Sequence, residues 1–423
     1  MTNRSLHVVL VERTGPRLLE LLAAALDGSG PAIAPLDARL PPARLAALVE
    51  ALGPASVEGP DGVTTIRSGQ ERAVAEGTAV VAPTSGSTGV PKGVELSAAA
   101  LLHSARASLA RIGARPGERW LCCLPAMYIA GLQVLVRSLV SGTDPVLAER
   151  ADEQTVAASG CAHVSLVPTQ LQRLLGGREG DLSTPLTGFR SVLLGGAAAP
   201  AGLLEAARAA RVPVVTTYGM TETSGGCVYD GLPLDGVRVK IGDDDRIWIA
   251  GPVLFSGYRQ GGRGGLGGKV SPQDRGDPGG SSPRESQWLR TGDLGRMDSA
   301  GRLVVRGRAD DVINTGGYLV VPGEVAAVLQ TCPGVRDVAV VGQPDPEWGA
   351  RVVAVVAPTD PADPPTLELL RLHVQERLSR YAAPSRVVMV DAVPMLPTGK
   401  HDLARLRQEL LRWEQTEAES VTN

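Results

Sequence analysis

Cysteine is scarce in this sequence, and its five cysteines form neither a CxxC pair nor a cluster with histidine. Cysteine-based zinc sites and disulfide frameworks are recognised by characteristic cysteine patterns, so neither is supported as the basis of the fold. An odd number of scattered thiols instead predicts buried or inert side chains in a reducing compartment. The cysteines are Cys122, Cys123, Cys161, Cys227 and Cys332.

Long apolar runs and an excess of one charge are absent as well. The N-terminal run at residues 6–11 is shorter than the ~7–15 apolar residues of a secretory signal, and no run approaches the ~18 that span a membrane. We therefore expect a cytoplasmic protein without a membrane span. The 42 basic and 45 acidic residues nearly cancel, which indicates neither a nucleic-acid-binding surface nor an acidic tail.

The order of apolar segments predicts the fold class of the larger part of the chain. The pattern predicts a strand at residues 79–82 that ends at Pro83, and a helix that begins after the N-cap Ser97 and runs through Ile112. Two more strands are expected at residues 192–194 and 212–216. Strands that alternate with helices favour a layered α/β domain.

The pattern changes after residue 237. Segments VRVKI, DRIWIAG and FSGY alternate like antiparallel strands, which predicts a small β subdomain within residues 237–258. Residues 260–287 are mostly Gly, Arg, Ser and Pro, so we expect a mobile surface insertion. An Arg/Gly run can also bind nucleic acid, but this one lacks the interleaved aromatics that would favour that function.

The last part of the chain predicts a second, smaller α+β domain. Strands are expected at residues 338–341, 352–356 and 387–390, with helices at 367–379 and from Asp402 onward. The polar tail after Trp413 is expected to fray. We predict an N-terminal domain at 1–308, containing the 260–287 insertion, and a mobile C-terminal lid domain at 309–423.

The most informative segment is TSGSTGVPKG, residues 84–93, directly after a predicted strand. Glycines let backbone N–H groups turn inward as an anion-binding nest, hydroxyls add donors, and Lys92 adds a positive charge. The segment is not a Walker loop, because Gly93 follows the lysine where that loop has Ser or Thr. It predicts a polyphosphate site made by Thr84, Ser85, Gly86, Ser87, Thr88, Gly89 and Lys92.

This loop resembles the signature loop of the acyl-adenylate-forming (AMP-binding) superfamily, which includes acyl-CoA synthetases, luciferases and peptide-synthetase adenylation domains. Further motifs of that superfamily follow in order as far as Lys400, so the resemblance covers most of the chain. It implies an acid–thiol ligase that uses ATP, Mg²⁺ and coenzyme A on a small carboxylic acid. It also makes a homodimer plausible.

The resemblance assigns a nucleotide site to several short motifs. LLGGA would lie along the adenine through Gly195, Gly196 and Ala197. In YGMTET, Tyr218 and Gly219 would contact the adenine, Thr221 the α-phosphate, and Glu222 the magnesium ion, for which a carboxylate oxygen is a suitable hard ligand. The ribose hydroxyls would bind Asp293 of TGD and Arg308 of GRADD, since a carboxylate can accept two hydrogen bonds from a diol.

The resemblance also implies two catalytic arrangements of the lid domain. In the first, Lys400 would stabilise the charge that develops on the α-phosphate during adenylation. The lid would then rotate about Asp310, so that Gly316 and Gly317 line a tunnel for the pantetheine arm.

The acid is indicated by residues 124–143, which contain Tyr128 and Arg137. Many relatives have His where Tyr128 stands, and amino-acid-activating domains have a nearby Asp that is missing here. Arg137 interrupts an apolar helical stretch, so it either reaches solvent, pairs with a structural carboxylate, or contacts a second carboxylate on the substrate. This segment, the compact length and residues 226–237 resemble the o-succinylbenzoate–CoA ligases of menaquinone biosynthesis, which act on an aromatic dicarboxylate.

Two alternatives stay open. One is a ligase for another aryl or medium-chain acid, or one that loads a carrier protein. The other is a non-catalytic homologue that only binds an acyl nucleotide. The second is disfavoured because Lys92, Glu222, Asp293 and Lys400 are all intact.

Overall fold

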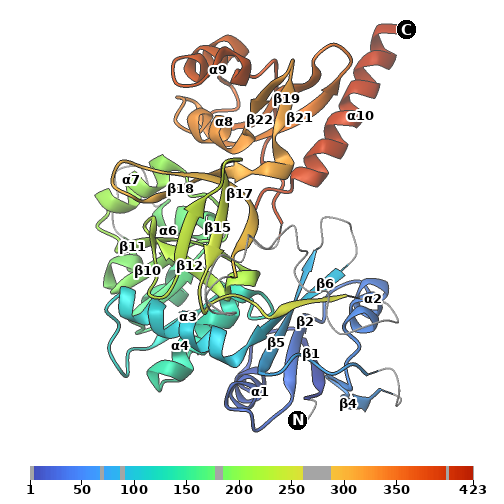
Figure 1. The fold of residues 1–423 in the computed structure, drawn as a ribbon. Coiled ribbons are helices and arrows are strands. Elements are labelled where there is room, and N and C mark those ends of the chain that lie inside the picture. Colours follow the sequence, from blue (N-terminus) through green and yellow to red (C-terminus); the bar gives the residue numbers. More distant parts are fainter. Residues whose placement is uncertain are drawn as a thin grey trace. The chain divides into compact units, whose positions relative to one another are not determined.

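The computed structural model describes residues 4–66, 71–85, 91–176, 184–260, 287–396 and 400–422 (Figure 1). The chain divides into two compact units. The first comprises Met1–Gly196, Ala207–Lys240 and Trp248–Arg290, and the second comprises Ala197–Ala206, Ile241–Ile247 and Thr291–Asn423. The boundary at residue 308 remains a prediction, and most of the expected insertion, residues 261–286, lies outside the described residues.

The first unit contains a seven-stranded sheet with strand order β16-β6-β5-β2-β1-β3-β4. Strands β1, β2, β3 and β5 are parallel, whereas β4, β6 and β16 join them antiparallel. Its apolar runs are almost wholly buried because helices pack on the sheet. The strands are β1 (Leu6–Val11), β2 (Ala32–Asp37), β3 (Ser56–Gly59), β4 (Gly62–Thr65), β5 (Thr78–Ser85), β6 (Pro91–Ser97) and β16 (Gly257–Gln260). The accompanying helices are α1 (Pro16–Asp27) and α2 (Pro42–Leu52).

Two sequence expectations are corrected in this sheet. Strand β5 does not end at Pro83 but continues through Ser85, because Pro83 pairs opposite Gly93 in the hairpin with β6. The FSGY segment does not belong to a small β subdomain. Its last two residues, Gly257 and Tyr258, begin β16, which pairs with β6 at the edge of the large sheet.

A second seven-stranded sheet has the order β13-β12-β11-β10-β9-β7-β8. The predicted Ser97 cap is confirmed, since its hydroxyl accepts from the N–H of Ala100 at 3.1 Å at the start of α3. Helix α4 packs beside α3 (Figure 1) and ends at Gly142, whose φ of +69° suits glycine. The strands are β7 (Trp120–Cys122), β8 (Val146–Leu147), β9 (His163–Leu166), β10 (Ser191–Leu194), β11 (Val214–Met220), β12 (Gly225–Tyr229) and β13 (Leu232–Pro233). The helices are α3 (Ala98–Arg111), α4 (Ile129–Ser141), α5 (Glu153–Ala158), α6 (Pro168–Leu175) and α7 (Ala201–Ala209), with 3₁₀ turns at Pro185–Gly188 and Thr221–Thr223.

The small β sheet predicted from the alternating segments is present, with the order β14-β15-β17-β18. Its strands are β14 (Arg238–Ile241), β15 (Arg246–Ala250), β17 (Leu289–Met297) and β18 (Leu303–Arg308).

The second unit has a five-stranded sheet in which side chains alternate between two helical layers. Val338, Val340 and Val356 face a core shared with α8 and α9, whereas Ala339 and Val355 face Leu406 of α10. Both faces are therefore covered, which explains the nearly continuous apolar runs of the sequence. The elements are β19 (Ile313–Thr315), β20 (Tyr318–Val320), β21 (Val335–Asp345), β22 (Gly349–Pro358), β23 (Arg386–Met389), α8 (Pro322–Leu329), α9 (Leu367–Gln375) and α10 (Leu403–Thr422), with 3₁₀ turns at Ala309–Asp311 and Arg380–Ala382.

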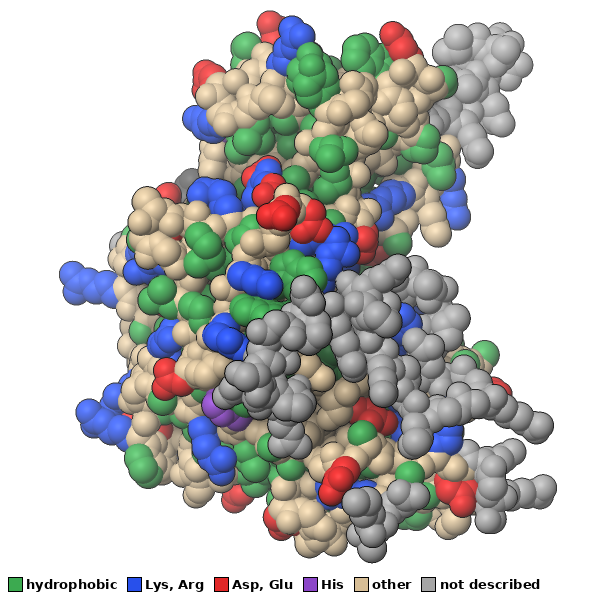
Figure 2. Space-filling view, in the orientation of Figure 1, with side chains coloured by type: hydrophobic (Ala, Val, Ile, Leu, Met, Phe, Trp, Pro, Cys, Tyr) green, Lys and Arg blue, Asp and Glu red, His purple; other side chains and the backbone are tan. Residues whose placement is uncertain are grey.

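The expected fraying after Trp413 is wrong, because the backbone of α10 is helical to Thr422. The cysteine prediction is confirmed insofar as all five thiols are free and buried. No helix among the described residues is both long and apolar enough to cross a membrane. On the face drawn in Figure 2, basic and acidic side chains are interspersed.

Arg259, in the edge strand β16, forms hydrogen bonds and an ion pair with segments that come earlier in the chain. Its guanidinium is 4% exposed and forms an ion pair with Glu95 at 3.1 Å. It also donates to the carbonyls of Leu52, Gly53, Arg72 and Ala73. These bonds compensate the cation for its lost hydration.

We predict that Arg259→Met lowers the free energy of unfolding by about 3–5 kcal/mol, because Glu95 keeps a buried charge without its partner. Urea denaturation of the full chain measures this loss. Arg13→Met is the matched control, since Arg13 pairs with Glu149 on the surface and should contribute less than about 1 kcal/mol. Equal losses in the two variants would contradict the prediction.

Candidate functional site

The phosphate-loop candidates lie at the end of the β5–β6 hairpin. Thr84 and Lys92 are paired across the hairpin, where the Thr84 hydroxyl donates to the Lys92 carbonyl at 3.5 Å. Ser85 is described in its backbone only, and Gly86, Ser87, Thr88 and Gly89 lie outside the described residues. The hairpin therefore brings Thr84 and Lys92 together at the base of the predicted loop.

The candidate adenine motifs meet at the ends of two parallel strands. Gly195 follows β10, and its N–H donates to the carbonyl of Leu166 at 3.1 Å. A Cβ on Gly195 would collide with the Thr217 hydroxyl, so glycine allows β11 to approach closely. Tyr218 and Gly219 continue β11 beyond this contact. These residues lie at the carboxyl ends of two parallel strands, which is where α/β sheets bind their ligands. Ala197 falls within the second unit.

Thr221 and Glu222 occupy a short 3₁₀ turn directly after β11. The turn is held by Thr223, whose hydroxyl lies 2.9 Å from the Met220 N–H and 2.7 Å from the Gly225 carbonyl. The Glu222 carbonyl accepts from the Phe255 N–H at 2.9 Å, and its carboxylate accepts from the Tyr258 hydroxyl at 2.9 Å. Sequence analysis missed Tyr258, because only the pairing of β16 with β6 brings it here.

In the second unit, Asp293 and Arg308 are opposite each other in the β17–β18 ladder. Arg308 Nη1 lies 3.4 Å from Asp293, and its Nη2 lies 3.3 Å from Asp310. One guanidinium thus joins the candidate ribose carboxylate to the candidate hinge carboxylate. The Asp293 N–H donates to the Thr291 hydroxyl at 3.1 Å, which fixes the TGD turn.

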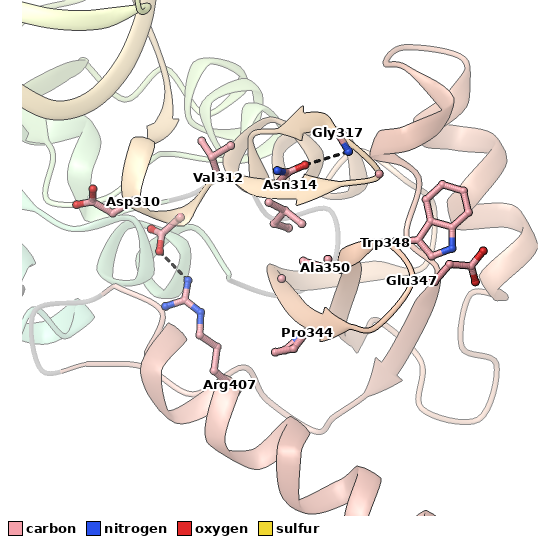
Figure 3. Close-up of a pocket in the computed structure, with 14 residues that line it drawn as sticks. Asp310, Val312, Asn314, Gly317, Pro344, Glu347, Trp348, Ala350 and Arg407 are labelled. Atoms are coloured by element: carbon pink, nitrogen blue, oxygen red, sulfur yellow. Dashed lines mark hydrogen bonds and ion pairs between the residues drawn. The ribbon is translucent and has the colours of Figure 1, made fainter.

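A pocket of about 690 Å³ in the second unit contains Asp310, Gly316 and Gly317 in its wall (Figure 3). A Cβ on Gly316 would lie 2.6 Å from the Trp348 ring, so only glycine leaves space between this turn and the indole. Gly317 donates its N–H to Asn314 at 3.1 Å, and Arg407 pairs with Asp311 at 2.7 Å at the other side of the pocket.

Lys400 is exposed, and residues 397–399 directly before it lie outside the described residues. Its carbonyl accepts from the Leu396 N–H at 2.7 Å, and the Asp402 N–H donates to the Pro394 carbonyl at 2.8 Å. Next to it, His401 lies 3.1 Å from Asp337. Backbone hydrogen bonds thus join the residues on the two sides of 397–399.

The candidate acyl residues belong to the start and middle of α4. Tyr128 is the N-cap residue, and burial raises the pKa of its phenol. Arg137 is only 5% exposed, and burial lowers the pKa of its guanidinium. Arg137 therefore does not reach solvent, which removes the first of the three roles considered for it.

Neutral groups surround the Arg137 guanidinium. Its Nη2 donates to the Ser165 hydroxyl at 3.0 Å, and its Nη1 to the Ser108 hydroxyl at 3.4 Å. The Trp120 ring lies under it, 4.4 Å from Cζ to the centroid, and Nε has no partner among the described atoms. No carboxylate of the described residues pairs with it, so a structural salt bridge is not its role there. Sequence analysis missed Trp120, Ser108 and Ser165, which come from three separate elements.

Comparison with known proteins defines the class. The family model of the AMP-binding enzymes matches residues 58–259, and that of the AMP-binding enzyme C-terminal domain matches residues 324–400. The chain is 41% identical over 414 residues to a probable 2-succinylbenzoate–CoA ligase of Mycobacterium tuberculosis, covering 95% of this chain and 97% of the relative. The chain belongs to the AMP-binding enzyme family.

More distant relatives carry the same kind of name. A 2-succinylbenzoate–CoA ligase of Listeria monocytogenes is 31% identical over 347 residues, which is 78% of this chain and 70% of that protein. The structure is also similar to that of the o-succinylbenzoate CoA synthetase of Bacillus subtilis in complex with its acyl-adenylate intermediate. That match has a TM-score of 0.76 and 26% identity, and covers 96% of this chain and 88% of the other. The predicted α/β architecture with a large N-terminal and a small C-terminal domain is confirmed.

Gly131 sets the start of α4 and thereby the position of Tyr128 and Arg137. A Cβ at Gly131 would lie 2.5 Å from the Pro125 carbonyl oxygen and 2.6 Å from that of Leu124. We predict that Gly131→Ala shifts the first turn of α4 and raises the KM for the acid about tenfold or more, without changing ATP binding. Steady-state kinetics and calorimetry measure the two effects. Gly202→Ala, where a Cβ meets nothing, is the control, and an unchanged KM in Gly131→Ala would refute the prediction.

Proposed function

We propose that this protein is an ATP-dependent acid–CoA ligase that converts 2-succinylbenzoate first to its acyl adenylate and then to its CoA thioester, in menaquinone biosynthesis. The near full-length similarity to ligases named for that acid supports the reaction. The observation that carries the choice of acid is Arg137, a buried cation that no described carboxylate neutralises.

A buried guanidinium without an anion is unfavourable, and a substrate carboxylate would remove that cost. The planar guanidinium also matches a carboxylate by paired hydrogen bonds. An acid with a single carboxylate needs that group at the α-phosphate of ATP, so it has none left for Arg137. A dicarboxylate has one for each position. We therefore assign Arg137 to the carboxylate that does not react.

Trp120, Ser108 and Ser165 fit this assignment because they hold the guanidinium without neutralising it. Hydroxyl groups accept its N–H donors, and the indole face attracts a cation. The Ser108 hydroxyl is in turn 2.7 Å from the Tyr229 hydroxyl, which fixes its orientation. Tyr128, at the first turn of the same helix, would bound the acyl pocket.

In the adenylation step, the acid carboxylate attacks the α-phosphate and pyrophosphate leaves. Lys92, Thr84 and the remaining loop residues, Ser85, Gly86, Ser87, Thr88 and Gly89, would bind the β- and γ-phosphates. Gly195, Gly196, Ala197, Tyr218 and Gly219 would bind the adenine, and Asp293 with Arg308 the ribose. Thr221 and Lys400 would stabilise the charge on the α-phosphate.

Magnesium would be held by Glu222. A single carboxylate fits this ion, because Mg²⁺ in nucleotide sites takes most of its ligands from phosphate and water. No group of three or more metal-binding side chains exists among the described residues, so a protein-only cage is not the arrangement there. When bound, the ion would reduce the negative charge of the phosphates.

In the thioester step, coenzyme A would reach the acyl adenylate by way of Gly316 and Gly317. The pocket beside this turn, with Trp348 on its wall, is a suitable channel for the pantetheine arm. Asp310 would act as the hinge, and its carboxylate contacts the neighbouring Arg308 at 3.3 Å.

The function is tested by pyrophosphate release with ATP and Mg²⁺ across a panel of acids, with and without coenzyme A. We expect 2-succinylbenzoate to be preferred over benzoate, octanoate and amino acids, with a CoA thioester formed. Arg137→Met should raise the KM for this dicarboxylate about 100-fold, the effect of losing one partner of a buried charge pair. The KM for benzoate should change little in the same variant.

Arg106→Met, which removes an exposed arginine from α3, is the matched control. Turnover of a different acid alone would keep the reaction and reject the named substrate. Equal effects of Arg137→Met on the dicarboxylate and on benzoate would reject its contact with the second carboxylate. ATP binding without turnover of any acid would favour the non-catalytic homologue.

A second prediction separates the two half-reactions. Lys400→Ala should lower adenylation by at least about 100-fold, because the charge on the α-phosphate loses its main stabilising cation. Thioester formation from supplied acyl adenylate and coenzyme A should persist near the wild-type rate. Single-turnover assays of each step measure this, and equal loss of both steps would overturn the assignment of Lys400.

A further inference from the structure

Tyr258 of β16 contacts two side chains that the proposed function places at the nucleotide. Its hydroxyl donates to Glu222 Oε1 at 2.9 Å. The Lys92 ammonium lies over its ring, 5.6 Å from the centroid. One phenol thus links the phosphate-loop lysine to the carboxylate proposed to hold magnesium.

Backbone pairing and a neighbouring aromatic ring fix the position of Tyr258. In the antiparallel β16–β6 ladder, Tyr258 is opposite Val94 and Gln260 is opposite Lys92. Tyr258 and Lys92 are therefore diagonal neighbours on one face of the sheet, within reach of long side chains. The ring is further held by Phe255, which packs edge-on at 4.7 Å. Phe255 also donates its N–H to the Glu222 carbonyl at 2.9 Å, so one short segment fixes Glu222 at two points.

The two contacts of Tyr258 keep the Glu222 carboxylate and the Lys92 ammonium available for a ligand. A carboxylate and an ammonium at one site tend to pair with each other, yet no ion pair of the described residues joins Glu222 to Lys92. The phenol offers each a neutral partner instead. The ring attracts the ammonium without using any of its three N–H donors, and the hydroxyl uses one carboxylate oxygen and leaves the other for a cation.

We propose that Tyr258 is a positioning residue for nucleotide binding. Its hydroxyl orients the Glu222 carboxylate toward a hard divalent cation, and its ring keeps the Lys92 ammonium separate from that carboxylate until phosphate oxygens replace the ring. This inference rests on the proposed function, which assigns Glu222 to magnesium and Lys92 to the terminal phosphates.

Two substitutions separate the roles of the hydroxyl and the ring. Tyr258→Phe removes the hydroxyl and keeps the ring, whereas Tyr258→Leu removes both. The probes are Mn²⁺ binding to the protein–ATP complex, followed by electron paramagnetic resonance, and ATP binding by calorimetry in a metal chelator. For Tyr258→Phe we expect the Kd for Mn²⁺ to rise about tenfold, the usual effect of losing a hydrogen bond to a charged acceptor. Metal-free ATP binding should stay unchanged, and only Tyr258→Leu should weaken it as well.

Tyr381→Phe is the matched control, because it removes a half-buried phenol whose hydroxyl accepts a hydrogen bond from Arg380. It should match the wild type in both measurements. A wild-type Mn²⁺ affinity in Tyr258→Phe would overturn the proposal. So would parallel weakening of metal and metal-free ATP binding together with a lower unfolding midpoint, which is the result of a merely structural role. Failure of the wild type to bind ATP would instead reject the proposed function itself.

Discussion

The antiparallel pairing of β6 with both of its neighbours is the constraint on which the phosphate end of the proposed nucleotide site depends. Strand β5 supplies Thr84, β6 supplies Lys92, and β16 supplies Tyr258. Because side chains alternate between faces, a slip of one residue in β16 would turn Tyr258 away from Lys92. Arg259, the next residue, prevents such a slip by its buried bonds to Glu95 and to the carbonyls of earlier segments. Stability and site geometry are therefore set by adjacent residues of one strand.

Two buried arginines of the first unit show two ways of accommodating a charge. Arg259 has a carboxylate partner and several carbonyl acceptors, so its charge is compensated within the protein. Arg137 has hydroxyl groups and an indole, which accept hydrogen bonds or attract a cation but carry no negative charge. The difference is informative because burial alone would disfavour both guanidinium groups equally. A buried cation that has hydrogen-bond acceptors but no carboxylate partner therefore indicates a binding site for an anion.

Local signals predicted much of the fold. Alternation and apolar runs located strands in every sheet, among them β5, β10, β15 and β21, and the Ser97 cap defined the start of α3. The strand β6, which carries Lys92, was not predicted, because the Gly/Ser/Thr-rich segment was interpreted as a loop throughout. The extension of β5, the partner of β16 and the helical end of α10 were not predicted, since they depend on pairing and packing between distant segments. Tyr258, Trp120 and Ser165 were missed for the same reason. In the sequence each is an ordinary strand residue, and its contacts become known only when the pairing and register of the strands are known.

The burial of every cysteine has a chemical consequence for an enzyme whose product is a thioester. Thiolates attack activated acyl groups, and an exposed cysteine would compete with the thiol of the incoming co-substrate. Burial raises the pKa of Cys122 to about 11, and those of Cys123 and Cys227 to about 12, which suppresses the reactive form at neutral pH. Cys161 and Cys332 are buried too, and their pKa values are also raised by burial. The polypeptide is thereby protected from acylating itself, and the activated acid is left for an external nucleophile.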